Sequence, residues 1–558
     1  MESGGKVSIS QLRNLVRSYI DQHLYPTALF WAEKAMSLSN NELQDVYWFC
    51  QALFYTKQYD RAVHALTSRG LHESNLACRY LVGKCYAECK KWQEALDVLE
   101  MEEKCSKISF SVELGAGSKK LDAAIQLLRG VVYDAMDNGP MASDCYKEAL
   151  RNDVHCYEAF DNLMSHFMLM PNEEADFLKL LPFDEQCLPE EIPLLKYLYE
   201  IKMQECKKVV KPPSPFERLS NSLDVTLCVA QKQFSKCDFQ SCYKMTSQII
   251  QEDSLHNACL PLHISCMVEL KKSNDLFFLA HKLVENYPHQ AVSWYAVASY
   301  YYLLSKYEAA RRFFSKATTI DHNFGPAWIG FGHSFAVEGE HDHAMAAYFS
   351  ASKLMPGSYQ PLLYVGMEYM KTNNSKLAER FFNQALTIAP DDPSVKHELG
   401  LVAFKNGNFA KAEKCFLEAL HSVEGLSEGI VLDTWEPLVN NLGHALRKQG
   451  KYDEALEYHQ QALLLVPQNS QTLSSIGFVY SLLGKYEDAI NYFHKALSLR
   501  RDDTFSVQML GQTLEQFSLA VLPDVPEEQL HSSIDVEERN VQESENFDTS
   551  IEDMSMET

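Results

Sequence analysis

Clusters of cysteine are the first residues of this chain whose type and spacing could bind a metal. Cys78, Cys85 and Cys89 can share one face of a helix, and Cys237 and Cys242 flank a predicted turn. A structural zinc ion needs four Cys or His ligands, and neither cluster has the partners to complete that set. The sequence therefore predicts no metal site. The fifteen cysteines, an odd number with no Cys-x-x-Cys pair, indicate reduced thiols in the cytosol or nucleus.

Catalysis would need a nucleophile, a base or a cofactor-binding motif, and we find none in the sequence. His341-Asp342-His343 looks like a small chelate, but it falls at a predicted turn and helix start, where exposed side chains are the simpler explanation. Phosphate-binding glycine-rich loops, the zinc-protease motif and the nucleophile elbow of hydrolases are absent. We predict that the protein is not an enzyme and that it binds no cofactor and no small-molecule substrate.

The charge of the chain argues against a nucleic-acid partner. Its 558 residues include 51 basic and 75 acidic side chains, a formal net charge of −24 that would repel a polyanion. From Asp524 to Thr558 there are twelve acids and one base, so −11 of this charge lies in a segment without hydrophobic periodicity. We predict that residues 523–558 form a disordered acidic tail. The longest uncharged stretch, Gln290 to Ser305, is shorter than the ~20 residues of a membrane span, so no membrane partner is expected.

An internal repeat of 34 residues is the strongest pattern in the second half of the chain. Gly332, Gly366 and Gly400 follow one another at that spacing, and a second run in the same phase contains Gly443 and Gly477. An alanine stands twelve residues after each of these glycines, and in the first run an aromatic residue stands sixteen after it. Two antiparallel helices approach closely only where small residues face one another, so the spacing predicts tightly packed helix pairs.

One unit, containing Trp328, Gly332, Ala344, Tyr348 and Pro356, closely matches the signature of the tetratricopeptide repeat. The chain therefore resembles tetratricopeptide-repeat proteins. This resemblance implies an all-α fold, an α-solenoid superhelix of roughly fourteen helix pairs, followed by the acidic tail.

The regularity of the repeat divides the chain into four predicted segments. Residues 1–170 hold degenerate repeats, 171–222 form a proline-containing connecting segment, 223–522 form the regular superhelix, and 523–558 are the tail. Within the connecting segment Ser214 precedes Pro215, the minimal pattern of proline-directed phosphorylation. Ser214 is thus a candidate phosphosite, where phosphate could dock an arginine-bearing partner, and a stiff unmodified linker is the alternative.

The concave side of such a superhelix is lined by positions of the first helix of each pair that packing does not use. These positions predict a groove for an extended or helical peptide, held by apolar anchors and a few amide contacts. Burial by the superhelix itself is the alternative for each single residue. The predicted lining is Ile329, His333, Leu363, Met367, His397, Leu401, Phe404, Asn440, His444, Arg447, Ser474, Phe478, Phe505 and Gln508.

Asn440, His444 and Arg447 superficially resemble the clamp with which chaperone-binding repeat proteins grip a C-terminal carboxylate. The repeated lysines of that clamp are missing from the neighbouring units of this chain. The groove is therefore not predicted to bind a terminal carboxylate in that way.

Several longer stretches resemble one family in particular. They are Gly325 to Leu354 with GHSFAVE, Thr372 to Pro390, Trp435 to Gln468, and Arg500 to Gly511 with RRDDTFSV. They are similar to the cell division cycle sixteen family of anaphase-promoting complex (cyclosome) subunits. The similarity is densest from Leu223 to Gly511 and looser toward the N-terminus.

This resemblance implies a non-catalytic scaffold subunit of a multisubunit E3 ubiquitin ligase that acts in mitosis. It implies a homodimer formed through the N-terminal repeats, contacts with related repeat proteins of the complex, and a small accessory subunit held in the C-terminal groove. It also implies a location in the nucleus and cytoplasm, and at the spindle or centrosome during mitosis. A peptide-binding adaptor or co-chaperone that acts alone is the alternative.

Overall fold

The computed structural model describes residues 9–101, 118–203, 212–426 and 431–521, and all regular structure in these ranges is helical. The chain forms two compact units. The first extends to Glu205 and includes the short stretch Leu354–Gly357, and the second comprises the remainder from Cys206 onward. The predicted acidic tail lies outside the described residues, whereas the all-α prediction is confirmed in the ranges above.

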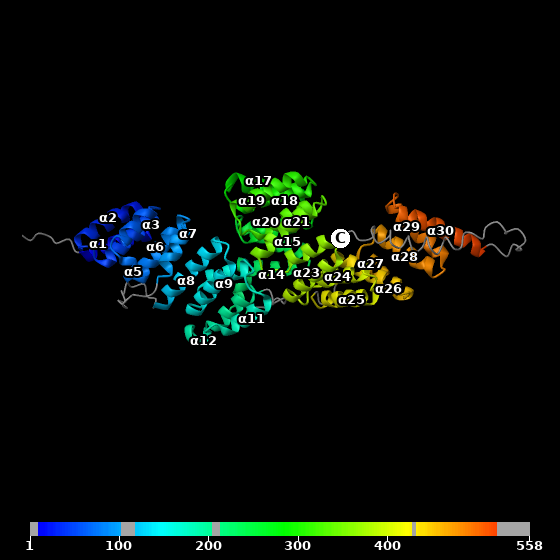
Figure 1. Ribbon diagram of the computed structural model, residues 1–558, viewed down its shortest axis with the longest axis horizontal. Helices are drawn as coiled ribbons and strands as arrows, with labels where there is room; N and C mark the ends of the chain where they lie inside the picture. The colour runs from blue at the N-terminus through cyan, green and yellow to red at the C-terminus, as the bar shows by residue number, and fades with distance from the viewer. Residues whose placement is uncertain (1–8, 102–117, 204–211, 427–430, 522–558) are drawn as a thin grey trace, which may run out of the picture. The chain divides into compact units, whose positions relative to one another are not determined.

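The described part of the first unit consists of helices of 4 to 18 residues, coloured blue to teal in Figure 1. Nε and Nη2 of Arg13 donate hydrogen bonds to the two carboxylate oxygens of buried Asp45 at 2.8 and 2.7 Å. This bidentate ion pair connects the first helix to the third. The helices are α1 (Ile9–Asp21), α2 (Tyr25–Leu38), α3 (Leu43–Tyr55), α4 (Tyr59–Thr67), α5 (Leu71–Ser74), α6 (Leu76–Glu88), α7 (Trp92–Leu99), α8 (Ser118–Ala135), α9 (Gly139–Asn152), α10 (Tyr157–Ser165), α11 (Pro171–Leu180), α12 (Phe183–Gln186) and α13 (Ile192–Glu200).

The first part of the predicted connecting segment, 171–222, belongs to the core of this first unit. Phe177, Phe183 and Tyr199 are buried in one cluster with residues of α9 and α10. Tyr199 stacks on Phe160 with ring centroids 4.1 Å apart. The prolines of this segment suggested a linker, but at Pro171 and Pro193 they occupy the first turn of a helix, where the missing amide has no intrahelical partner to lose.

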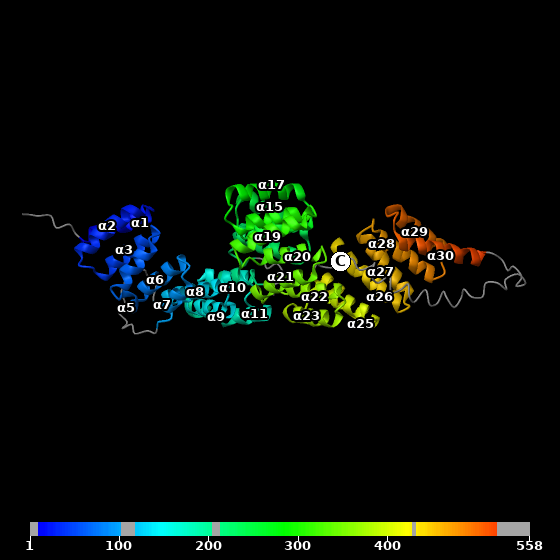
Figure 2. The same ribbon diagram turned by 45° about the horizontal axis from the view of Figure 1, so that its top comes forward.

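The second unit repeats one helix pair, here called helix A and helix B, along the chain (Figures 1 and 2). Neighbouring helices in sequence pack against each other, as α28 does with α29 and α29 with α30. Its elements are η1 (Glu217–Asn221), α14 (Leu223–Ser235), α15 (Phe239–Glu252), α16 (Cys259–Glu269), α17 (Ser273–Asn286), α18 (Ala291–Leu303), α19 (Tyr307–Ile320), α20 (Gly325–Ala336), α21 (His341–Leu354), α22 (Gln360–Lys371), α23 (Ser375–Ile388), α24 (Pro393–Lys405), α25 (Phe409–Leu426), η2 (Asp433–Trp435), α26 (Glu436–Lys448), α27 (Tyr452–Leu465), α28 (Ser470–Leu482), α29 (Tyr486–Leu499) and α30 (Thr504–Val521).

A glycine of helix A meets an aromatic ring of helix B in each of the five pairs from α20 to α29, as the 34-residue period predicts. A Cβ atom added to Gly332 would lie 2.3 Å from the Tyr348 ring, and one added to Gly400 would lie 2.5 Å from the Phe416 ring. No side chain tolerates such a distance, so only glycine lets the two helices approach this closely. The 34-residue spacing therefore follows from the packing of helix A against helix B.

Glycine also makes the turn between the two helices of a pair. Gly407, Gly450 and Gly484 have φ angles of 74°, 80° and 73°, in the left-handed region that a side chain disfavours. Each stands seven residues after the packing glycine of its helix A. The chain thus reverses direction at a fixed distance from the closest helix contact.

The packing glycine can be tested by adding one methyl group. Gly400→Ala should lower the free energy of unfolding by about 1 to 3 kcal/mol, because the new Cβ must push the Phe416 ring aside. Gly425→Ala, near the end of α25, is the matched control, since its Cβ would meet nothing within 4 Å. There the change should be neutral or should stabilise the helix by up to ~1 kcal/mol. Urea unfolding measures both variants, and equal effects would contradict the assigned register.

Candidate functional site

The residues predicted to line the groove differ widely in exposure. Leu363, Leu401, Phe404, Asn440 and Ser474 are buried, and Gln508 is exposed. The others are partly buried: Ile329, His333, Met367, His397, His444, Arg447, Phe478 and Phe505. For the five buried side chains the alternative is correct, because the superhelix itself covers them. The groove stays a prediction. Ser214 is exposed, and its phosphorylation also stays a prediction.

A first polar cluster is built around His333 of α20. Its Nδ1 lies 2.8 Å from the hydroxyl of Tyr348, the same ring that packs on Gly332. The edge of the His333 ring also meets Tyr364 of α22, with centroids 4.5 Å apart. The cluster therefore links two consecutive helix pairs through a predicted groove residue.

A second polar cluster lies between α26 and α27. His459 takes the position of the helix B aromatic, and its ring packs on Gly443. Its Nδ1 lies 2.7 Å from Oδ1 of Asn440, and its ring meets His444 at 4.9 Å and 65°. Two ring nitrogens of this cluster, His459 Nε2 and His444 Nδ1, are buried without a hydrogen-bond partner among the described residues.

The histidines of both clusters are held in the neutral form. Burial lowers the pKa of His333 to about 4 and that of His459 to about 3. The pKa of His444 is lowered well below its ordinary value, first by burial and then by electrostatic interactions with His459, Arg447 and Lys448. A clamp for a terminal carboxylate needs cationic donors. Neutral His444, with Asn440 already bonded to His459, does not supply that charge.

Aromatic and hydroxyl contacts continue from α26 toward α30. The guanidinium of Arg447 lies 4.8 Å from the centroid of the Phe478 ring, which meets Phe505 edge-on at 5.8 Å. Nearby, the Ser474 hydroxyl lies 2.5 Å from that of Ser506. The structure thus brings four of the predicted residues together on α26, α28 and α30.

Helix α30 carries a glycine at the packing position of a helix A, and no ring of the described residues lies against it. A Cβ added to Gly511 would meet nothing within 4 Å, whereas at the equivalent Gly477 it would lie 3.1 Å from Phe493. Val507 and Leu514 stand four residues before and three after Gly511, on the same helix face. They are 54% and 45% exposed. We call this apolar face, formed by Val507, Gly511 and Leu514, the α30 notch.

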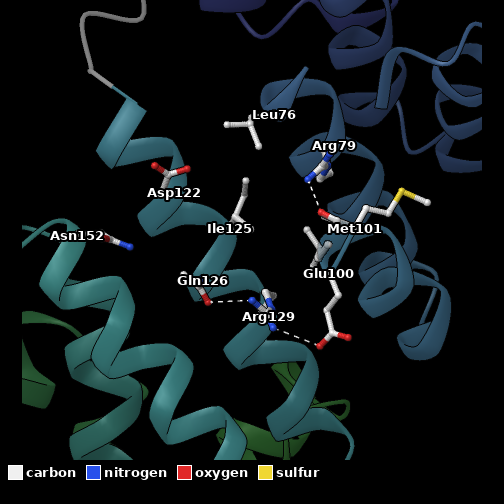
Figure 3. A pocket seen from close by; sticks show the side chains of 10 residues that line it. Leu76, Arg79, Glu100, Met101, Asp122, Ile125, Gln126, Arg129 and Asn152 are labelled. Carbon is white, nitrogen blue, oxygen red and sulfur yellow. Dashed lines mark hydrogen bonds and ion pairs between the residues drawn. The ribbon is translucent and has the colours of Figure 1, made fainter. Parts of the chain in front are cut away.

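The first unit contains a cavity of about 700 Å³ where α7 stops early (Figure 3). Helix α7 has 8 residues, against 14 in α9. Arg79 donates to the Met101 carbonyl oxygen at 2.8 Å, and Arg129 donates to Glu100 and Gln126 at 3.2 and 3.4 Å. The chain's own groups therefore bind both guanidinium groups on this wall, and none of the site residues predicted from the sequence lies there.

Neither cysteine cluster completes a metal site. Across the described ranges, no group of three or more His, Cys, Asp or Glu side chains is arranged to hold a metal ion. Burial raises the pKa of the Cys78 and Cys85 thiols to about 12, so both stay protonated at neutral pH. None of the helices that the structure describes has the length and apolar character that crossing a bilayer requires.

His459 and the α30 notch were not predicted from the sequence, although both leave a signal in the repeat. His459 stands sixteen residues after Gly443, where the other units have Tyr or Phe. Gly511 has the glycine of a helix A, but Glu527 stands sixteen residues later. A search for positions that depart from the repeat pattern would have identified both His459 and the α30 notch.

Comparison with known proteins shows the family of this chain. Two models described as "Tetratricopeptide repeat" match residues 436–502 and residues 291–324 and 365–392, and "Anaphase-promoting complex, cyclosome, subunit 3" matches residues 21–102. "Cell division cycle protein 16 homolog" of Homo sapiens is 51% identical over 92% of this chain and 85% of the human protein. The chain belongs to the cell division cycle protein 16 family.

Other members of the cell division cycle protein 16 family match nearly the whole chain. "Anaphase-promoting complex subunit 6" of Arabidopsis thaliana is 38% identical over 91% of this chain and 96% of the plant protein. A crystal structure of the "APC/C hetero-tetramer Cut9-Hcn1" superimposes with a TM-score of 0.74 and 32% identity, covering 91% of this chain and 97% of that chain. The predicted family and the predicted tetratricopeptide-repeat fold are both confirmed.

The neutral histidines predict a loss of stability in acid. Because the folded-state pKa of His459, about 3, lies below the ordinary 6.5, the unfolded chain binds more protons at pH values between these two. The contribution of His459 is complete above about pH 6.5 and is lost as the pH falls. Between pH 7 and pH 5 it should lower the free energy of unfolding by roughly 1 to 2 kcal/mol.

Urea unfolding at pH 7 and pH 5 measures this loss. His459→Phe should reduce the difference between the two pH values by that amount. His421→Phe, which changes a histidine side chain that is 92% exposed, should leave the difference as it is in the unmodified chain. An unchanged pH dependence in His459→Phe would show that His459 is already protonated in the folded state.

Proposed function

We propose that this chain is a non-catalytic scaffold subunit of the anaphase-promoting complex, a cell-cycle ubiquitin ligase, and that its second unit holds a partner chain. The observation that carries the proposal is the open α30 notch. Family relatives bear the names of subunits of this complex, which supports the assignment to it. The residues of the regular repeat are used for helix packing, and stacked helix pairs of this kind form extended binding surfaces. Both points support a docking role in place of catalysis.

The α30 notch has the form of a helix A that lacks its helix B. Helices α24, α26 and α28 end five residues after their packing glycine, whereas α30 continues for ten residues after Gly511. The described part of the chain therefore does not turn back to cover the notch. An exposed apolar face beside an empty glycine position suits a helix supplied by another chain.

A solved relative supports a second chain on this unit. That crystal structure is of a hetero-tetramer of Cut9 and Hcn1, so this relative assembles with another protein. We propose that the accessory chain of the present protein follows the C-terminal groove and places a helix in the α30 notch. A helix docked on Val507 and Leu514 would continue the stacking of helices beyond α30.

The α30 notch can be closed by one substitution. Gly511→Leu should leave folding intact, because its side chain would extend into open space. It should reduce recovery of a small accessory subunit at least ~10-fold, because the side chain occupies the place of the docked helix. Affinity purification in mild salt, with quantitative mass spectrometry of co-eluting subunits, measures this.

Gly425→Leu is the control, because this glycine also has open space beside it but lies far from α30 in the sequence. Equal recovery with both variants would reject the notch as a docking site. Absence of every ligase subunit from the unmodified protein would instead favour an adaptor or co-chaperone that acts alone.

We further propose that the first unit forms the homodimer. Helix α2 exposes Phe30 and Leu38, which are 52% and 58% accessible, and Leu24 just before α2 and Tyr55 at the end of α3 are also exposed. Lys34 Nζ lies 5.2 Å from the centroid of the Phe30 ring, and about half of the Phe30 side chain remains exposed to a partner surface. A patch of this kind on a terminal helix pair supports pairing with a second copy.

Disruption of that patch should produce monomers. Phe30→Asp combined with Leu38→Asp places two charges on the proposed dimer surface, so the dimer should dissociate at micromolar concentration. Analytical ultracentrifugation measures the mass. Leu180→Asp, at a side chain of α11 that is 71% exposed, is the control and should remain dimeric. A dimer that survives the double substitution would exclude this face.

Two further expectations belong to the same proposal. Location in the nucleus and cytoplasm, and at the spindle or centrosome in mitosis, follows from membership of a mitotic ligase. Phosphorylation of exposed Ser214 before Pro215 would add charge to the chain just before η1, where an arginine-bearing partner could bind.

A further inference from the structure

His459 is a polar residue at a position where the other helix pairs from α20 to α29 have tyrosine or phenylalanine. In the neighbouring pairs Phe416 and Phe493 fill this place without exposing polar atoms to the interior. His459 is fully buried there, and its Nε2 has no hydrogen-bond partner among the described residues. An unpaired buried nitrogen destabilises the folded chain, so packing alone would favour phenylalanine.

The hydrogen bond to Asn440 determines which nitrogen of His459 carries the proton. Asn440 Oδ1, at 2.7 Å from His459 Nδ1, is a carbonyl oxygen and can only accept. Nδ1 therefore carries the hydrogen. Because the ring is neutral, Nε2 has a lone pair and no hydrogen, so it requires a donor.

His444 is placed to supply that donor. Its ring centroid lies 4.9 Å from that of His459 with the planes at 65°, and a hydrogen bond of ~2.9 Å between two imidazole nitrogens separates the centroids by about 5 Å. His444 Nδ1 is itself buried without a partner among the described residues. A rotation of the His444 ring would join Nδ1–H to His459 Nε2 and satisfy both nitrogens.

We propose that Asn440, His459 and His444 form a hydrogen-bond relay that makes Nε2 of His444 an acceptor on the groove wall, and that this acceptor binds a main-chain N–H of the partner segment. The proposal rests on the groove function proposed above. It makes His444 a specificity-determining contact and His459 a positioning residue.

The charges around His444 restrict the kind of donor. Arg447 and Lys448 lie on the same helix and act on His444, so a cationic lysine, arginine or free amino terminus would be repelled. A main-chain amide is an uncharged donor that every extended peptide offers. The relay therefore binds the main chain of the partner segment through a hydrogen bond and positions that segment along α26.

Binding of Hcn1, the second protein named in the solved relative, provides the probe. With purified Hcn1 and the full-length chain, isothermal titration calorimetry should show at least ~10-fold weaker binding for His459→Phe and for His444→Phe. The double variant should bind no more weakly than either single variant, because one relay is broken in each case. His421→Phe, at an exposed side chain, should bind like the unmodified chain.

Thermal stability separates a positioning role from a structural one. His459→Phe places at this position the ring that Phe416 and Phe493 already provide, so its melting temperature should be unchanged or higher while affinity falls. Equal affinity of His459→Phe and the unmodified chain would overturn the relay. A fall in affinity that only parallels a fall in melting temperature would overturn it as well.

Nuclear magnetic resonance of histidine-labelled protein tests the relay directly, because it shows which ring nitrogen of each histidine carries the proton. We expect a proton on Nδ1 in both His444 and His459 when Hcn1 is bound, identified by loss of each signal in the corresponding phenylalanine variant. A proton on Nε2 of His444 would overturn the proposal. If the unmodified chain does not bind Hcn1, the groove proposal fails by itself, and the tautomers of the free chain still decide the relay.

Discussion

The close approach of two helices at a single glycine is the contact on which the helix pairs from α20 to α29 depend. A ring of helix B lies where the first side-chain carbon of any other residue would be, as Gly366 and Phe382 show with 2.4 Å between that place and the ring. The contact sets the distance between the helices of a pair. In the pairs that contain Gly400, Gly443 and Gly477, a turn glycine follows seven residues later, so these pairs reverse direction at the same distance from the contact.

A structure built from one repeated contact makes its exceptions informative. His459 keeps the ring shape but adds two nitrogens, and Gly511 keeps the glycine but meets no ring from the described part of the chain. Neither exception improves packing, since one leaves a buried nitrogen unpaired among the described residues and the other leaves an apolar face in solvent. Both lie in the part of the chain from α26 to α30, where the sequence also predicts residues of the groove lining.

Burial also decides the electrostatic character of the predicted groove. His333, His444 and His459 could have supplied positive charge, but removal from water keeps all three neutral. The polar clusters therefore act through directed hydrogen bonds. Recognition of this kind depends on where a backbone lies, which suits a scaffold that holds an extended segment in one register.

The amino-acid sequence by itself determined the helix pairs, because the 34-residue period and the interval of sixteen between glycine and ring are local properties of one pair. It did not determine which wall residues stay accessible, since Leu363, Leu401 and Phe404 are buried in clusters that also contain residues of the next helix pair. It predicted a helical piece at Ile192–Ile201 within the connecting segment, but not that Tyr199 of this piece packs on Phe160 across 39 residues of chain. Only the tertiary structure decided these points, because contacts between distant segments depend on the packing of whole helices and not on local spacing.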